Sequence, residues 1–265
     1  MAALIEIRDM HKIYNPGENE VRALDGIDLT IDRNEFVAII GQSGSGKSTL
    51  MNMLGCLDVA TTGQYILNGE DVSDLTDDEL SDIRNKEIGF IFQGFNLIAN
   101  LTAFENVELP LIYRGVGAKE RERLSEEALE KVGLGHRMDH KPSEMSGGQQ
   151  QRVAIARAIA QAPPIILADE PTGNLDSGSS EEILGILKKL HQEGRTVIII
   201  THDNDIARRA DRVIKIRDGR IESDTGKIGK EREATETIEV TETIESSETI
   251  ENVENIVETG EYKGE

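Results

Sequence analysis

The sequence predicts an α/β fold built on a mainly parallel β-sheet, and three observations in residues 1–225 support it. Short apolar runs of strand length alternate with amphipathic segments of helix length, which is the pattern of α/β proteins. Several runs, such as residues 36–40 and 196–200, are almost entirely apolar, as expected of strands buried on both faces of a parallel sheet. A glycine-rich stretch lies directly between one of these runs and a helix-like segment.

The expected elements follow from these runs. Strands are predicted at residues 4–8, 27–31, 36–40, 89–92, 165–168, 196–200 and 212–217. Residues 97–160 interrupt the alternation and contain only helix-like segments, for example residues 120–132 with their many Glu, Arg and Leu side chains. We therefore expect a helical insertion at about residues 97–160, within a folded domain of residues 1–225.

The formal net charge of −21 is unevenly distributed along the chain. Residues 226–265 contain 12 acidic and 4 basic residues, a net charge of −8, which leaves −13 for residues 1–225. Glu occurs at every third position from residue 233 to 254 and Ile at every sixth position from 238 to 256. This acidic low-complexity tail has few apolar residues and is predicted to be disordered. An acidic docking segment for a partner is the alternative.

The composition also limits the class of protein. The single cysteine, Cys56, cannot form a disulfide within the chain and indicates a reducing compartment. No apolar run approaches the roughly 18 residues that cross a bilayer, and the N-terminus lacks the pattern of a secretory signal. We expect a cytoplasmic protein, or one bound peripherally to a membrane. The acidity argues against nucleic acid as a partner, since phosphate binding needs a basic surface.

Residues 41–48, GQSGSGKS, fit the phosphate-binding pattern G-x-x-x-x-G-K-[ST], with a strand before them and a helix after them. Glycines let backbone N–H groups turn toward phosphates, and the helix N-terminus adds partial positive charge. Lys47 is expected to reach the β- and γ-phosphates, and the Ser48 hydroxyl to bind Mg²⁺. The predicted nucleotide-binding residues of this stretch are Gly41, Ser43, Gly44, Ser45, Gly46, Lys47, Ser48 and Thr49.

Two acidic residues, Asp169 and Glu170, end the apolar run at residues 165–168. The carboxyl ends of strands in an open α/β sheet are where ligands bind. We expect Asp169 to hold Mg²⁺ through water and Glu170 to polarise the attacking water. Together with residues 41–48, this pair predicts an ATPase site.

Residues 145–150, MSGGQQ, resemble the signature motif of the ABC ATPases, which is usually LSGGQ. Met145 replaces Leu by another apolar residue. Ser146 can cap a helix over residues 150–160, so the motif is a second anion site at a helix N-terminus. The residues of the motif predicted to contact nucleotide are Ser146, Gly147, Gly148 and Gln149.

The resemblance covers about residues 2–222 and implies roles for four further residues. Gln93 corresponds to the glutamine that contacts Mg²⁺ and the water, and His202 to the switch histidine that contacts the γ-phosphate. Asp176 belongs to a D-loop-like segment, residues 173–176, and Tyr14 corresponds to the aromatic residue that stacks on adenine. The implied catalytic residues are Glu170, His202 and Gln93, the implied Mg²⁺ ligands are Ser48, Gln93 and Asp169, and the implied cofactors are ATP and Mg²⁺.

The family architecture implied is a P-loop NTPase core with a mainly parallel sheet, an antiparallel β subdomain and the helical insertion. Two such subunits face each other head to tail, with each ATP between residues 41–48 of one copy and residues 146–149 of the other. Residues 88–111 and 151–177 look most like the lipoprotein-release and macrolide-export group. A proline that this group usually carries before Thr61 is missing here, which bears only on the subgroup.

The function implied is that of an ATP-binding and ATP-hydrolysing subunit that powers a membrane ABC transporter. An exporter, or a system of the lipoprotein-release or antimicrobial-peptide type, fits the subgroup, with the chain peripheral on the cytoplasmic face of the cell membrane. The permease would be a separate chain, one helix of which docks after Gln93 against Phe95, Leu97, Ile98 and Leu101. Packing of these residues inside the helical insertion is the alternative. The alternative function is ATP-driven mechanotransmission of the FtsE type, without substrate transport.

Overall fold

The computed structural model describes residues 3–17 and 19–226. The chain divides into two units, Met1–Ser223 and Asp224–Glu265. The second unit lies almost entirely outside the described residues, and so does the predicted disordered tail. The division of the chain at residue 225 stays a prediction.

The central sheet of the first unit is mainly parallel, as the apolar runs predicted. Its strand order is β10-β9-β3-β8-β7-β6, and β3 pairs in parallel with β8 and β9, as β7 does with β8 and β6. The strands are β3 (Phe36–Ile40), β6 (Ile88–Phe92), β7 (Ile165–Asp169), β8 (Thr196–Thr201), β9 (Arg212–Arg217) and β10 (Arg220–Asp224). Every residue of β8 is buried, as expected of a strand covered on both faces.

A second sheet has the order β2-β1-β4-β5 and is antiparallel in every pairing. Its strands are β1 (Ile5–Tyr14), β2 (Val21–Ile31), β4 (Thr62–Leu67) and β5 (Glu70–Asp71). This is the antiparallel subdomain that the family resemblance implied. The strands β1 and β2 are longer than the predicted strands at residues 4–8 and 27–31. Register shifts in their pairing, one of them between Ile7 and Met10, interrupt the alternation of buried and exposed residues by which a strand is recognised in a sequence.

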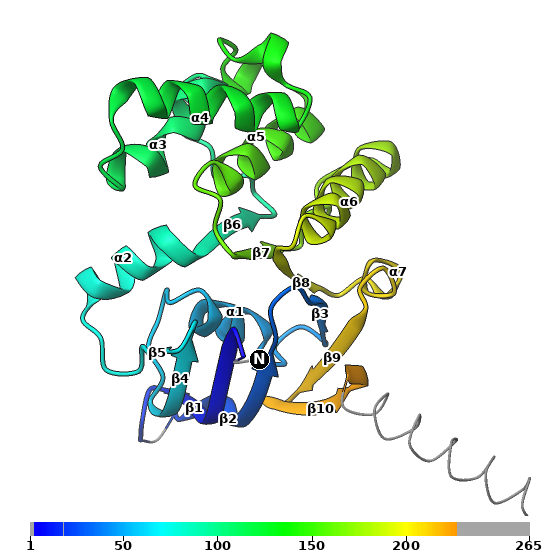
Figure 1. Ribbon diagram of the computed structural model, residues 1–265. Coiled ribbons are helices and arrows are strands. Elements are labelled where there is room, and N and C mark those ends of the chain that lie inside the picture. The colour runs from blue at the N-terminus through cyan, green and yellow to red at the C-terminus, as the bar shows by residue number, and fades with distance from the viewer. Residues whose placement is uncertain (1–2, 18, 227–265) are drawn as a thin grey trace, which may run out of the picture. The chain divides into compact units, whose positions relative to one another are not determined.

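Helices cover both sheets, and α3, α4 and α5 gather at one end of the unit (Figure 1). The helices are α1 (Lys47–Leu54), α2 (Asp77–Glu87), α3 (Ala103–Tyr113), α4 (Ala118–Lys131), α5 (Gly147–Ile159), α6 (Ser177–Gln192) and α7 (Asn204–Ala207). Residues 97–160, all of them described, contain three of these helices, two short 3-10 turns and no strand. The N-terminal side chains Thr76, Thr102 and Ser146 each form a capping box, which fixes where α2, α3 and α5 begin.

Two apolar clusters hold the first unit together. One joins both sheets with α1 and α2, and the other joins the central sheet with α3 to α6. Cys56 lies in the first cluster with 2% of its surface exposed, and burial raises the pKa of its thiol to about 11. Cys56 is therefore a small buried residue of the core. Among the described helices, none combines the length and the apolar content that crossing a bilayer requires.

Candidate functional site

A cavity of about 800 Å³ lies at the carboxyl edge of the central sheet. The strands β3, β6, β7 and β8 all run in parallel and end at this edge, so the loops that follow them meet there. The predicted site residues that line the cavity are Ser43, Gly44, Gly46, Lys47, Ser48, Thr49, Gln93, Asp169, Glu170 and His202. Residues far apart in the chain thus form one site because of the strand order.

The loop between β3 and α1 has the backbone shape that a phosphate-binding loop needs. Gly44 and Gly46 have φ angles of +79° and +102°, a left-handed region that favours glycine. A Cβ atom on Gly46 would lie 2.5 Å from the Ala23 carbonyl oxygen, so no larger residue fits. The Lys47 Nζ donates to the carbonyls of Gly41 and Gln42, at 2.8 Å each. These two bonds occupy two of the three Nζ hydrogens.

Two of the predicted nucleotide-binding residues in this loop, Gly41 and Ser45, do not line the described cavity. Both serve the shape of the loop. A Cβ atom on Gly41 would lie 2.4 Å from the Ile216 carbonyl oxygen, and the Ser45 side chain is buried with 4% of its surface exposed. Their direct contact with nucleotide stays a prediction.

Asp169 is the last residue of β7 and Glu170 follows it, and both line the cavity. Burial raises the pKa of Asp169, the neighbouring Glu170 carboxylate raises it further, and Lys47 opposes the shift. Glu170 has a φ angle of +44°, a strained conformation for a residue with a side chain. Its carboxylate accepts from the His202 backbone N–H at 2.9 Å and from the Thr201 hydroxyl at 3.0 Å. The His202 Nδ1 lies 2.6 Å from the same carboxylate.

Gln93, which follows β6, is joined to the loop after Glu170. The Gln93 Nε2 donates to the Asn174 Oδ1 at 3.3 Å, and the Asn174 Nδ2 donates to the Gln93 carbonyl at 3.0 Å. A Cβ atom on Gly173 would lie 2.7 Å from the Gln93 Nε2, so this glycine lets the two loops approach closely. Asn174 was not predicted as a site residue, although it lies in the segment 173–176 that the motif singled out.

The signature-like residues 146–149 lie apart from the cavity in the described part of the same chain. The Ser146 Oγ accepts from the Gln149 N–H at 3.3 Å, and the Gln149 side chain accepts from the Ser146 N–H at 3.0 Å, so the pair caps α5. Asp176 caps α6 through Ser179, at 2.9 Å from its N–H and 2.7 Å from its hydroxyl. A Cβ atom on Gly148 would lie 2.6 Å from the Ser179 Oγ, which places Gly148 beside the start of α6.

Tyr14 is half-buried near Thr49 but is absent from the described cavity lining. Its hydroxyl donates to the Asp58 Oδ2 at 3.0 Å, and the Lys12 Nζ lies 5.0 Å from its ring centroid. Burial and Asp58 raise the pKa of the phenol, while a hydrogen bond from Thr49 lowers it. A role in adenine stacking stays a prediction.

Six residues that line the cavity were not predicted as site residues: Val21, Arg22, Ala23, Ile200, Asp218 and Gly219. The turn between β9 and β10 is fastened to the phosphate loop, because the Gly219 N–H donates to the Ser45 carbonyl at 3.0 Å and the Asp25 N–H donates to the Gly219 carbonyl at 2.9 Å. No local motif identifies Asp218 and Gly219, since the β9–β10 turn reaches the phosphate loop only in the folded chain.

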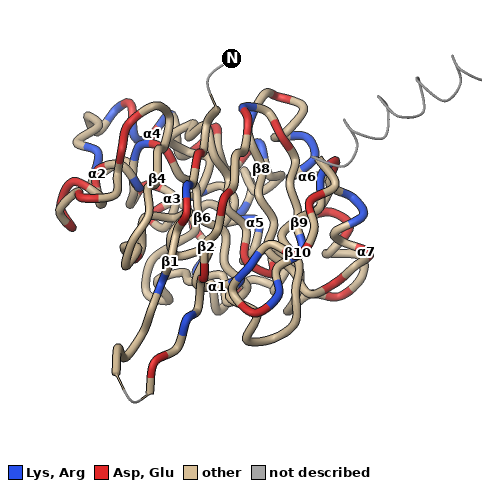
Figure 2. The backbone as a smooth tube through the Cα atoms, turned by 90° about the horizontal axis from the view of Figure 1, so that it is seen from below, with Lys and Arg blue, Asp and Glu red and all other residues tan. Residues whose placement is uncertain are grey.

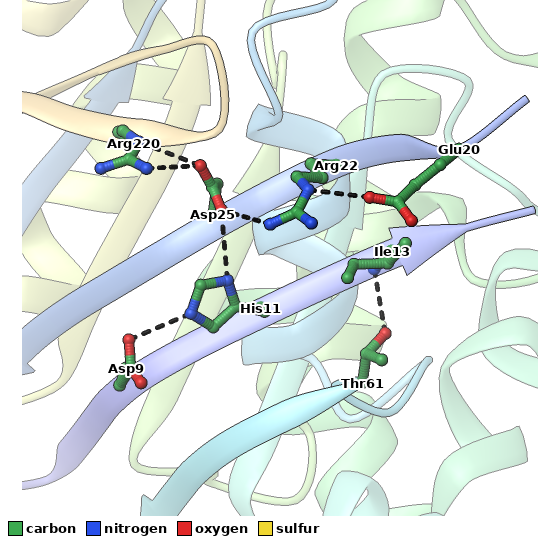
Figure 3. A network of polar contacts seen from close by, with 8 residues as sticks. All are labelled: Asp9, His11, Ile13, Glu20, Arg22, Asp25, Thr61 and Arg220. Atoms are coloured by element: carbon green, nitrogen blue, oxygen red, sulfur yellow. Dashed lines mark hydrogen bonds and ion pairs between the residues drawn. The ribbon is translucent and has the colours of Figure 1, made fainter. Parts of the chain in front are cut away.

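A polar network centred on Asp25 supports this wall of the cavity (Figure 3). The Asp25 carboxylate lies 2.5 Å from the Arg220 guanidinium, 3.5 Å from that of Arg22 and 3.3 Å from the His11 Nδ1. The hydrogen bond from Arg220 is the main cause that lowers the pKa of Asp25. The network therefore joins β1, β2 and the start of β10, next to the turn that bonds to the phosphate loop.

Comparisons with known proteins agree with the motifs. Residues 24–173 match the family model described as ABC transporter. The macrolide export ATP-binding/permease protein MacB of Hyphomonas neptunium is 57% identical over 223 residues, which are 84% of this chain and 35% of that protein. An uncharacterized ABC transporter ATP-binding protein of Thermotoga maritima is 54% identical over 222 residues, 84% of this chain and 95% of that protein. The chain spans about a third of the length of the MacB relatives.

Solved structures give the same result. The dimeric structure of a post-hydrolysis state of the ATP-binding cassette MJ0796, bound to ADP and Pi, has a TM-score of 0.77 and 48% sequence identity. The similarity covers 83% of this chain and 97% of that one. A dimeric structure of MJ0796, described as a bacterial ABC transporter cassette, also has a TM-score of 0.77, with 49% identity. On motifs, fold and relatives together, the chain belongs to the ABC transporter family, as one of its ATP-binding proteins.

Proposed function

We propose that this chain hydrolyses ATP to ADP and phosphate and that a homodimer of it powers a separate membrane permease. The observation that carries the proposal is the convergence of Lys47, Ser48, Gln93, Asp169 and Glu170 on one cavity at the ends of parallel strands. Phosphoryl transfer in this class of enzyme rests on positioning and electrostatics around an in-line water attack, and these are the groups that it requires.

Mg²⁺ fits the donors around this cavity. The Ser48 hydroxyl, the Gln93 amide oxygen and the Asp169 carboxylate are oxygen ligands of the kind that Mg²⁺ prefers. Burial and the neighbouring Glu170 raise the pKa of Asp169, and Lys47 offsets this only in part, so a bound cation would stabilise the ionised carboxylate. When bound, Mg²⁺ would neutralise charge on the β- and γ-phosphates of ATP. Ser48, Gln93 and Asp169 are the residues that would hold it.

The chain's own residues would then do the chemistry. Backbone N–H groups of the loop and the Lys47 Nζ hold the phosphates, and Glu170 accepts the proton of the attacking water. His202 fits the role of γ-phosphate sensor, because its side chain is 74% exposed and can reach a phosphate in the cavity. The Glu170 side chain beside it is only 15% exposed. Transfer of His202 from Glu170 to the γ-phosphate would free a carboxylate oxygen for the water.

A second copy of the chain is needed to complete the site. Residues 146–149 lie at a helix N-terminus of the kind that binds anions, but they do not line the cavity of their own described chain. In the proposed head-to-tail dimer, Ser146, Gly147, Gly148 and Gln149 of one copy contact the ATP held by Lys47 of the other. Asp176, beside Gly148, would lie at the same interface. The MJ0796 structures named above are dimeric, which supports this arrangement.

The permease partner would place the chain peripherally on the cytoplasmic face of a membrane. The MacB relatives are macrolide export ATP-binding/permease proteins, which favours transport over mechanotransmission. A cavity of about 600 Å³ between α2, β6, α3 and α5 offers the docking site. Its apolar lining includes Leu57 and Tyr113, which are 46% and 82% exposed. Figure 2 shows acidic residues along the neighbouring α2.

Some of the residues expected to contact a permease helix are exposed, and others pack inside the helical insertion. Leu97 packs against the helical core, whereas Ile98 is 48% exposed. Asn96 is the member of this loop that lines the cavity. We therefore propose that the permease helix docks in the cavity beside Asn96, and not on the apolar side chains of residues 95–101.

Cysteine cross-linking tests the permease. In the full chain, a cysteine that replaces Asn96 or Asn100 should cross-link to a polytopic membrane protein in native membranes, because both residues lie in the exposed loop next to the cavity. A cysteine at exposed Gln192, the end of α6, serves as the control and should give no such product. Mass spectrometry identifies the product. A failure at both loop positions, or equal cross-linking at Gln192, would contradict the docking site.

The Mg²⁺ requirement should depend on pH through Asp169. Because the pKa of Asp169 is raised, protons compete with Mg²⁺ at a higher pH than for an ordinary aspartate, whose pKa is about 3.9. The Mg²⁺ concentration needed for half-maximal ATP binding should therefore increase as the pH falls toward this range. The Asp169→Asn variant should need more Mg²⁺ at every pH and show only the pH dependence of ATP itself. Identical pH profiles for the two proteins would remove Asp169 from the metal site.

A further inference from the structure

The side chain of Gln151, on α5, is completely buried. Its Nε2 donates to the Pro171 carbonyl at 2.7 Å and lies 3.4 Å from the Phe92 carbonyl. Phe92 directly precedes Gln93, and Pro171 directly follows Glu170. One amide therefore contacts the backbone next to two proposed catalytic residues.

The same helix holds the other side of the Gln93 loop. The Arg157 guanidinium donates to the Phe95 carbonyl at 2.9 Å and to the Asn96 carbonyl at 2.6 Å. Phe95 and Asn96 have φ angles of +61° and +50°, an uncommon backbone shape that these bonds support. The loop with Gln93 is thus tied to α5 at both ends, by Gln151 before it and by Arg157 after it.

Helix α5 begins at the capped Ser146, so these ties connect the signature-like residues to the catalytic loops. Gln93 and Asn174 also bond each other, which joins the loop after β6 to the loop after β7. Because a helix moves as a rigid element, a displacement at Ser146 would shift the Phe92 and Pro171 carbonyls together. The Gln151 side chain contacts both carbonyls.

Fold stability does not account for an amide at this position. The Gln151 Oε1 is buried and has no hydrogen-bond partner among the described residues. A buried acceptor without a partner destabilises the folded state, whereas an apolar side chain of similar length would not carry that cost. The donor function of the amide is what an apolar side chain would lack.

We infer that Gln151 is a positioning residue for ATP hydrolysis. By holding the carbonyls of Phe92 and Pro171, it fixes the positions of Gln93 and Glu170 relative to the N-terminus of α5. The inference rests on the proposed ATPase function. It assigns to Gln151 no contact with ATP or with the water. Its loss should therefore affect the rate of hydrolysis and leave the binding of ATP unchanged.

The first test replaces Gln151 by methionine in the full chain. Gln151→Met keeps the length of the side chain and removes both donor hydrogens. We expect kcat for ATP hydrolysis to fall by about tenfold or more, because small displacements of catalytic groups lower rates steeply. The Kd for ATP, measured by calorimetry, should stay within about twofold, since the phosphate loop is untouched.

A matched control separates positioning from stability. Thr196 is buried at the opposite end of β8, and its hydroxyl accepts from the Asn34 N–H at 2.8 Å. Thr196→Val, which leaves the Asn34 N–H without this acceptor, should lower the thermal unfolding midpoint at least as much as Gln151→Met does and keep kcat near the wild-type value. If kcat falls equally in both variants, stability explains the loss and the inference is wrong.

A second variant gives a readout even if Gln151→Met folds poorly. In Gln151→Glu, the protonated carboxyl can donate to the Pro171 carbonyl, and the ionised carboxylate cannot. Burial favours the protonated form, so lowering the pH should restore the donor. The kcat of Gln151→Glu relative to wild type should rise as the pH falls from about 8 to about 6. A ratio that is constant or falls contradicts a donor role.

The outcomes for the inference and for the proposed function differ. Wild-type protein that releases no phosphate from ATP overturns the proposed function, and the inference with it. Wild-type protein that is active while Gln151→Met has the same kcat overturns the inference alone. A rise in the Kd for ATP that matches the fall in kcat also overturns it, because it would place Gln151 in nucleotide binding.

Discussion

Replacement of Glu170 by glutamine is expected to lower the rate of ATP hydrolysis by about 10²–10⁴ while ATP still binds. The amide has the same size as the carboxylate, and its oxygen can still accept from the His202 N–H, which lies 2.9 Å from the carboxylate. It cannot take a proton from water. Phosphate release measures the rate, and calorimetry measures the binding of ATP.

A second acid-to-amide change provides the control for Glu170→Gln. Glu181 lies on α6 near Glu170 and pairs with Arg209, but its side chain is 60% exposed. Glu181→Gln should retain near-wild-type turnover, because exposed ion pairs contribute little. Near-normal turnover in Glu170→Gln would show that another group acts as the base.

Replacement of Ser146 by aspartate should prevent ATP-dependent dimerisation. Aspartate caps a helix as well as serine does, so α5 should begin where it does now. Its negative charge would face the ATP phosphates held by the partner copy, and like charges across an interface cost several kcal/mol. We expect the dissociation constant of the ATP-bound dimer to rise about a hundredfold or more. ATP binding by the monomer should not change.

The choice of variant matters at this motif. A residue larger than glycine at Gly148 would meet Ser179 of its own chain, with its Cβ at 2.9 Å from the Ser179 Cβ, so it would disturb α6 as well as the interface. Ser146→Thr is the better control, because it keeps an uncharged capping hydroxyl. Analytical ultracentrifugation with and without ATP compares the variants. If Ser146→Asp dimerises as wild type does, the signature-like residues do not face the phosphates of a partner.

The parts of the fold with continuous apolar runs were predictable from sequence. The predicted bounds 36–40 agree with β3, because burial on both faces of the sheet requires apolar residues along the strand. The predicted bounds 212–217 agree with β9, in which apolar residues are interrupted by charged ones. The strand β4 and the helix α2 were not predicted. Strand β4, TGQYIL, has polar residues over its first half, and α2 buries only Leu80 and Ile83.

The site shows the same division. Residues held in a local motif, such as Lys47 and Glu170, could be identified because their spacing encodes the loop that carries them. The turn with Asp218 and Gly219 reaches the cavity only through the pairing of β9 with β3, and no short motif records that contact. The sequence predicts Gln151 only as part of a helix, since its proposed role depends on two carbonyls that the tertiary structure brings to it.

ATP is expected to join two copies of this chain, each of which completes the other's site. Light scattering of the full-length Glu170→Gln protein tests it most directly, because slow hydrolysis should preserve the complex. With Mg²⁺ and ATP, we predict a mass twice that of the 29.2 kDa chain and one bound ATP per chain, and a monomer without nucleotide. A monomer that holds ATP under the same conditions would contradict the account.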